Sequence, residues 1–111
     1  MTVRDRIKGI QVELRDTDVS PMRSREMLVE LTALLGNCMD EMRQADAAFS
    51  QRLAACLDTE TKANRARIMA ETSPEYDRKR TAHDTRELVV EMIRSLKVVL
   101  RSTEEEMRLA R

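Results

Sequence analysis

The chain has 111 residues, of which 41% are apolar and 36% are charged, and its twenty basic residues offset twenty acidic ones. It contains one Phe, one Tyr, no Trp, two Gly and two Pro. A chain of this length forms one domain, and so few aromatic and turn residues exclude a β-sandwich, a barrel or a turn-rich α/β enzyme. Because Leu, Met, Ala, Glu, Arg and Lys dominate and all favour helices, the sequence predicts an all-α fold.

The formal net charge of zero argues against two kinds of partner. Domains that bind nucleic acid usually carry a positive excess, and helices that lie on a membrane usually have a basic polar face. The longest apolar runs, such as residues 88–90, are far shorter than the roughly 20 residues that cross a bilayer. The first residues also lack the apolar segment of a secretory signal. We therefore expect a cytoplasmic protein that does not contact a membrane.

The first predicted helix covers residues 3–16 and begins after Thr2, whose side chain can cap it. A helix this short is marginal in water, so its apolar stripe must dock on another segment. Counting outward from the break that follows places this stripe beside residues 25–36. The stripe consists of Val3, Ile7, Ile10 and Leu14.

A long second helix is predicted to begin at Ser20 and Pro21, because serine caps helices and proline fits the first helical position. Its apolar spacing runs without a slip to Phe49. Residues 58–67 are then mostly polar, and two interpretations stay open. The absence of Gly and Pro favours one continuous helix over residues 21–72, and the alternative is a break near residues 58–62.

The third predicted helix covers residues 74–110 and begins at the clearest boundary in the chain, Ser73-Pro74-Glu75. Opposite charges support pairing of the second and third helices, because residues 26–60 carry seven acidic and two basic residues, whereas residues 62–101 carry ten basic and six acidic ones. The predicted fold is therefore a single domain, an elongated, coiled-coil-like antiparallel helical hairpin with a short N-terminal helix.

The register of this hairpin follows if the chain reverses near Ser73. The third helix would then end before it reaches the start of the second, and the first helix would cover the remaining seam. The facing pairs would be Phe49 with Val98, Leu53 with Ile93, and Leu57 with Val89.

The apolar faces of both long helices are wider than a two-helix seam requires. Two helices alone bury little surface, so we expect a homodimer whose hairpins pack into a four-helix bundle. The alternative is that the wide face receives a different protein. The residues predicted to form the self-association face are Met27, Leu34, Met92 and Leu100.

The residues that could carry chemistry are sparse. His83 is the only histidine, which excludes helical di-iron sites and the usual zinc sites. Cys38 and Cys56 would lie about 27 Å apart on one helix, so they cannot form a disulfide and are interpreted as small buried residues. No phosphate-binding loop or nucleophile elbow is present. We therefore predict no catalytic residue, metal or cofactor, and no enzyme activity.

The strongest candidate for a nucleic-acid contact is the tip of the predicted hairpin, where basic residues gather and could hold phosphates. Several acidic residues and only one aromatic residue, Tyr76, accompany them. The basic residues of the tip are Lys62, Arg65, Arg67, Arg78, Lys79 and Arg80.

The segment from Ile93 to Arg111, with Ser73-Pro74-Glu75-Tyr76 upstream, resembles small helical-hairpin proteins of unassigned function from tailed phages and prophages. The resemblance covers about the last third of the chain and implies a phage accessory protein without carrying over any site residue. The sequence as a whole predicts a non-catalytic helical protein that self-associates and presents a helical face to a protein partner. The alternative is a nucleic-acid accessory factor that uses the basic tip.

Overall fold

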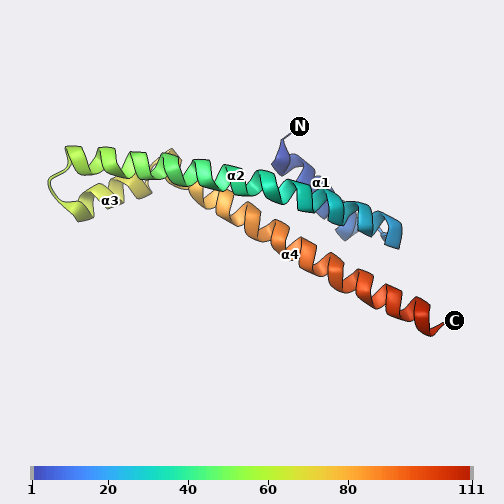
Figure 1. Cartoon of the computed structure of the whole chain (residues 1–111). Coiled ribbons are helices and arrows are strands. Elements are labelled where there is room, and N and C mark those ends of the chain that lie inside the picture. The colour runs from blue at the N-terminus through green and yellow to red at the C-terminus, as the bar shows by residue number, and fades with distance from the viewer. Residues whose placement is uncertain (1, 111) are drawn as a thin grey trace. The chain divides into compact units, whose positions relative to one another are not determined.

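A computed structural model describes residues 2–110 of the chain. It contains four helices: α1 (Val3–Asp16), α2 (Pro21–Thr59), α3 (Ala63–Glu71) and α4 (Pro74–Leu109) (Figure 1). No strand occurs in this range, so the predicted all-α class is confirmed. The chain forms two compact units, one of residues 2–37 with 87–110 and one of residues 38–86. In each of them an ion pair joins α2 to α4, and the two helices run in opposite directions (Figure 1), as expected for a helical hairpin.

The predicted helix starts are confirmed, because each rests on a local cap. The Thr2 side chain accepts a hydrogen bond from the Asp5 amide, and the Asp5 carboxylate accepts one from the Thr2 amide. Ser20 accepts one from the Arg23 amide at 3.1 Å, directly before α2. Ser73 accepts one from the Tyr76 amide at 3.4 Å, directly before α4.

The continuous helix predicted over residues 21–72 is wrong, and the alternative break near residues 58–62 is confirmed. Helix α2 ends at Thr59, and Lys62 has an extended backbone (φ −103°, ψ 121°) before α3 begins. The short α3 folds back so that Ala66 and Ala70 are buried with Cys56, and Phe49 and Leu53 pack against them. This burial explains the break, because a continuous helix would leave these small apolar residues in water.

The earlier reversal also changes the partner of Phe49 in the unit of residues 38–86. Its ring contacts Tyr76, with centroids 5.4 Å apart, and the Lys79 ammonium lies 4.7 Å from its centroid. The predicted partner, Val98, is 62% exposed, and Leu57, expected opposite Val89, is also exposed. The predicted register is therefore wrong, because the chain reverses before α3 instead of at Ser73.

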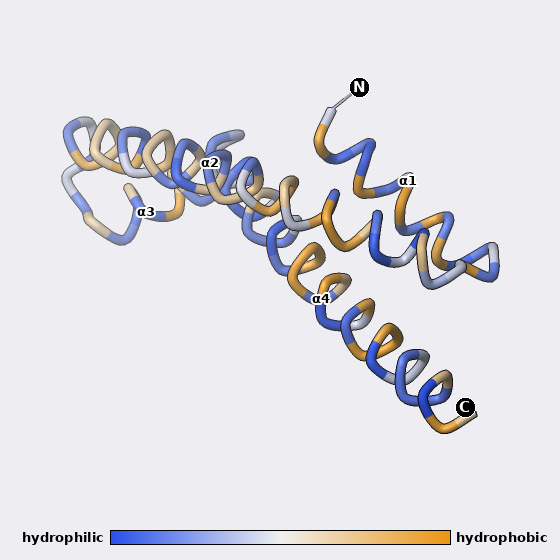
Figure 2. The backbone as a smooth tube through the Cα atoms, turned by 45° about the vertical axis from the view of Figure 1, so that its right-hand side comes forward, coloured by the Kyte–Doolittle hydropathy of each residue, from blue (hydrophilic) through white to orange (hydrophobic). Residues whose placement is uncertain are grey.

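The other unit consists of α1, the first part of α2 and the last part of α4. Apolar positions recur along α1 and α4 with helical spacing (Figure 2), and the unit's largest fully buried side chains include Ile7, Met27 and Leu31. Glu13 of α1 binds Arg23 of α2, and Arg6 of α1 binds Glu30 of α2, so the predicted docking of the first helix on this part of the second is confirmed.

The last part of α4 reaches the beginning of α2 in this unit. Arg25 donates a hydrogen bond to Glu104 at 3.0 Å. The expectation that the third helix stops short of this region is therefore wrong. Buried residues come from α1, α2 and α4 together, with Leu96 and Leu100 as the α4 contribution at this end.

Candidate functional site

The residues predicted to form a self-association face lie in the core of one chain. Met27 is completely buried, and Leu34, Met92 and Leu100 are each at most 9% exposed. All four belong to the unit of residues 2–37 with 87–110, where α1, α2 and α4 supply the buried residues. The prediction is wrong for a physical reason: the wide apolar face that suggested a second copy is filled by a third helix of the same chain.

An exposed apolar surface lies on α2 instead, on the side away from its buried residues. Val29 is 72% exposed, and it lines a shallow groove with Leu28, Thr32 and Ala33 of α2 and Lys97 of α4. Sequence reasoning missed this surface because it followed the main apolar stripe. The signal that could have found it is a second set of small and apolar residues, at the same helical spacing, on the opposite side of α2.

The tip predicted to contact nucleic acid divides into two parts. Lys62, Arg65 and Arg67 are exposed around α3, and Arg65 lies 4.0 Å from Glu60. Lys62 and Arg65 line a shallow depression beside Ile68. Three basic side chains with an acidic neighbour form only a small positive surface.

The other three basic residues of the tip, on α4, are engaged with neighbouring side chains. Arg78 donates two hydrogen bonds to Glu41 of α2, and these bonds raise the pKa of Arg78. Lys79 lies over the ring of Phe49, and the Arg80 guanidinium lies 5.9 Å from the ring centroid of Tyr76. These contacts compete with phosphate binding, and the two aromatic residues of the chain, Phe49 and Tyr76, contact each other.

His83 is a surface residue that binds across to α2. Its Nε2 lies 2.8 Å from Oδ1 of Asp46, and both side chains are about half exposed. Asp84 follows His83 on α4, and adjacent residues on a helix do not face each other. The pair holds α4 against α2.

The two cysteines are free and buried, as predicted. Burial raises the pKa of the Cys38 thiol, because the thiolate is poorly solvated in apolar surroundings. Cys56 packs against Ala66 and Ala70 of α3. Both therefore act as small core side chains.

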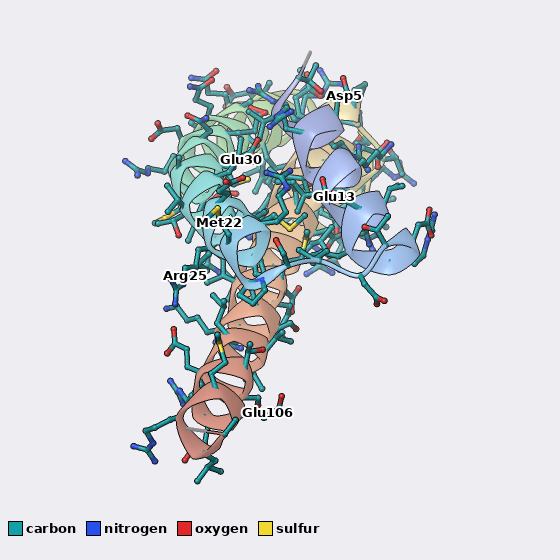
Figure 3. All side chains as sticks on the ribbon, turned by 90° about the vertical axis from the view of Figure 1, so that its right-hand side faces the viewer. Asp5, Glu13, Met22, Arg25, Glu30 and Glu106 are labelled. Atoms are coloured by element: carbon teal, nitrogen blue, oxygen red, sulfur yellow. The ribbon has the colours of Figure 1, made fainter. Side chains whose placement is uncertain are left out.

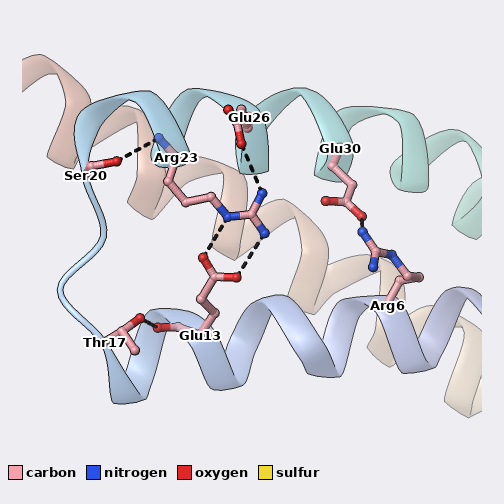
Figure 4. A network of polar contacts seen from close by, with 7 residues as sticks. All are labelled: Arg6, Glu13, Thr17, Ser20, Arg23, Glu26 and Glu30. Atoms are coloured by element: carbon pink, nitrogen blue, oxygen red, sulfur yellow. Dashed lines mark hydrogen bonds and ion pairs between the residues drawn. The ribbon is translucent and has the colours of Figure 1, made fainter.

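The most extensive polar network joins α1 to α2 (Figure 4). The Arg23 guanidinium donates two hydrogen bonds to Glu13, at 2.7 and 2.9 Å, and a third to Glu26 at 3.3 Å. These contacts hold the pKa of Glu13 below its ordinary value and raise that of Arg23. Figure 3 shows Glu13 beside α2, whereas Arg25 projects from α2 away from α1. The network orients α1 against α2.

Within residues 2–110, no three His, Cys, Asp or Glu side chains lie close enough together to hold a metal ion. Over the same range, none of the helices has an apolar stretch long enough to cross a membrane.

Comparison with known proteins adds no relative. No family model, no curated protein and no solved structure matches the chain.

Proposed function

We propose that this chain is a non-catalytic helical interaction protein, which self-associates and presents the outer face of α2 to a protein partner. The observation that carries this proposal is the exposure of Val29 in the groove with Leu28, Thr32, Ala33 and Lys97. A large aliphatic side chain in a groove lined by other apolar groups is a site that a partner side chain can fill.

A photoreactive amino acid placed at Val29 tests this function in cells. We expect irradiation to join the chain to a second polypeptide and to produce a species of higher mass. The matched control carries the same group at Glu91, an exposed residue on the charged outer face of α4. Absence of a product at Val29, or equal products at both positions, would contradict the proposed function.

The nucleic-acid alternative predicts a different outcome. Electrophoretic mobility of single-stranded and duplex probes, at low and then moderate salt, should remain unchanged with this chain. A shift at low salt that disappears in the triple variant Lys62→Ala, Arg65→Ala and Arg67→Ala would favour the basic tip instead. The resemblance to phage helical-hairpin proteins is compatible with the interaction function and names no partner.

A further inference from the structure

A second exposed surface with large apolar side chains lies on the last part of α4, within the unit of residues 2–37 with 87–110. Val98 is 62% exposed and Leu109 is 77% exposed, and both line one shallow groove on this helix. All residues that line the groove are exposed. This surface, the α4 end face, consists of Val98, Arg101, Ser102, Glu105, Glu106 and Leu109.

The α4 end face differs from the part of the same helix side that precedes it. Counting back from Val98 by four, three and four residues reaches only exposed, charged residues, which are Arg94, Glu91 and Glu87. Counting forward by the same steps reaches Ser102, Glu105 and Leu109. Solvated helix faces carry polar groups, and this spacing is the one with which a helix packs along another. A large aliphatic side chain at each end of a segment about 17 Å long therefore indicates a helix as the partner.

The charges of the α4 end face separate along the helix. Arg101 lies in its first half, and Glu105 and Glu106 lie in its second half. Among residues 2–110, no ion pair joins Arg101 or Glu106 to another side chain, whereas Arg108 binds Oε1 of Glu105 at 3.2 Å. The partner that fits this face is therefore apolar at both ends and presents an acidic group to Arg101.

A second copy of the α4 end face meets both requirements when the two helices run in opposite directions. If the two-fold axis passes between residues 103 and 104, Val98 of each copy lies level with Leu109 of the other. Arg101 then lies beside Glu105 of the other copy, on the same side of the contact, where it can bind the second carboxylate oxygen, Oε2. The two-fold axis repeats each contact. Parallel pairing in register would instead place Arg101 beside its own copy, which is unfavourable.

We propose that the α4 end face binds the same face of a second copy, antiparallel about residues 103 and 104. This inference rests on the self-association in the proposed function and names its surface, and it leaves the outer face of α2 to the protein partner. Ser102 is small enough to let the helices approach at the centre, and its hydroxyl can donate a hydrogen bond to Glu106 of the other copy. The apolar ends and the reciprocal charges together set the register.

Charge reversal with sedimentation equilibrium of the full chain tests the direction and the register. The wild-type chain should form a dimer. Arg101→Glu should weaken dimerisation by about tenfold or more, because two like-charge contacts replace two ion pairs. The double variant Arg101→Glu with Glu105→Arg exchanges the two charges and should restore the wild-type dissociation constant to within a few-fold. Circular dichroism of each variant checks that the helices are retained.

The apolar ends are tested by Leu109→Asp, which places a carboxylate against Val98 of the other copy and should also weaken the dimer by about tenfold or more. The matched control is Val29→Asp. Val29 is an aliphatic residue of the same unit with 72% of its surface exposed, but it lies on α2, outside the α4 end face. Val29→Asp should leave the dissociation constant unchanged. Because Leu109 and Val29 are both exposed in the single chain, both variants should keep the fold.

Three results would overturn the proposal. A dimer that tolerates both Arg101→Glu and Leu109→Asp uses another surface, although self-association would stand. A double variant that dimerises as weakly as Arg101→Glu alone shows that the two charges do not face each other, so the antiparallel register is wrong. A chain that stays monomeric refutes this inference and the self-association together, while the crosslink at Val29 still decides whether α2 binds a different protein.

Discussion

The rings of Phe49 and Tyr76 contact each other with centroids 5.4 Å apart and planes inclined by 47°. This contact joins the two aromatic residues of the chain and brings the start of α4 against α2. It forms because the chain reverses between Thr59 and Ala63 and α3 returns along α2. The position of the break between α2 and α3 therefore determines the register of α2 and α4 in the unit of residues 38–86.

Phe49→Ala should destabilise the fold by about 2 kcal/mol, because it removes the ring contact and part of the packing around α3. Urea denaturation followed by circular dichroism measures the change. Val98→Ala is the control and should alter the free energy of unfolding by less than about 0.5 kcal/mol, since Val98 is exposed. Equal losses in the two variants would favour the register with the reversal at Ser73.

Lys62→Asp should stabilise α3 by about 1 kcal/mol. Lys62 occupies the cap position of α3 and makes no side-chain hydrogen bond there, whereas aspartate is a preferred cap and also favours the positive end of the helix. Thermal unfolding gives the readout, with Lys62→Ala as a reference that lacks the capping group. A lower melting temperature for the aspartate variant would indicate a continuous helix, in which aspartate is the poorer residue.

Met27→Ala should cost about 3 kcal/mol, because the side chain is completely buried and its removal leaves a cavity. Val29→Ala, two residues away on the exposed side of α2, should cost less than about 0.5 kcal/mol in the monomer. Chemical denaturation at low protein concentration compares the two. If Met27→Ala lowered the free energy of unfolding by as little as Val29→Ala, Met27 would lie at the surface, which would contradict its burial among α1, α2 and α4.

Acidification should weaken the docking of α1. The Arg23 hydrogen bonds hold the folded-state pKa of Glu13 below its ordinary value of 4.5, so their contribution is complete above that value and is lost as the pH falls through the lower folded-state pKa. The stability difference between wild type and Glu13→Gln should therefore shrink towards zero at acidic pH. Glu91→Gln controls for general charge effects. A difference that does not change with pH would mean that the Arg23 contact is absent in solution.

The parts of the fold that sequence reasoning predicted are those that depend on neighbouring residues. Thr2, Ser20 and Ser73 cap helices that begin where expected, because a cap is completed within one helical turn. The spacing of Ile7 and Ile10 likewise predicted the buried side of α1. The exposed surface of α2 was not predicted. The residues that were expected to form a self-association face, such as Met92, are covered by other helices of the same chain.

The sequence by itself determined the helical class and the helix starts. Only the tertiary structure decided where α2 ends and which apolar face stays exposed. The physical reason is that a break at residues 60–62 has no strong local signal and is favoured by burial of Ala66 and Ala70, residues that gain their partners only after folding back. In the other unit, the packing of α1, α2 and α4 covers Met27 and leaves Val29 open, although both lie on one helix and two residues apart.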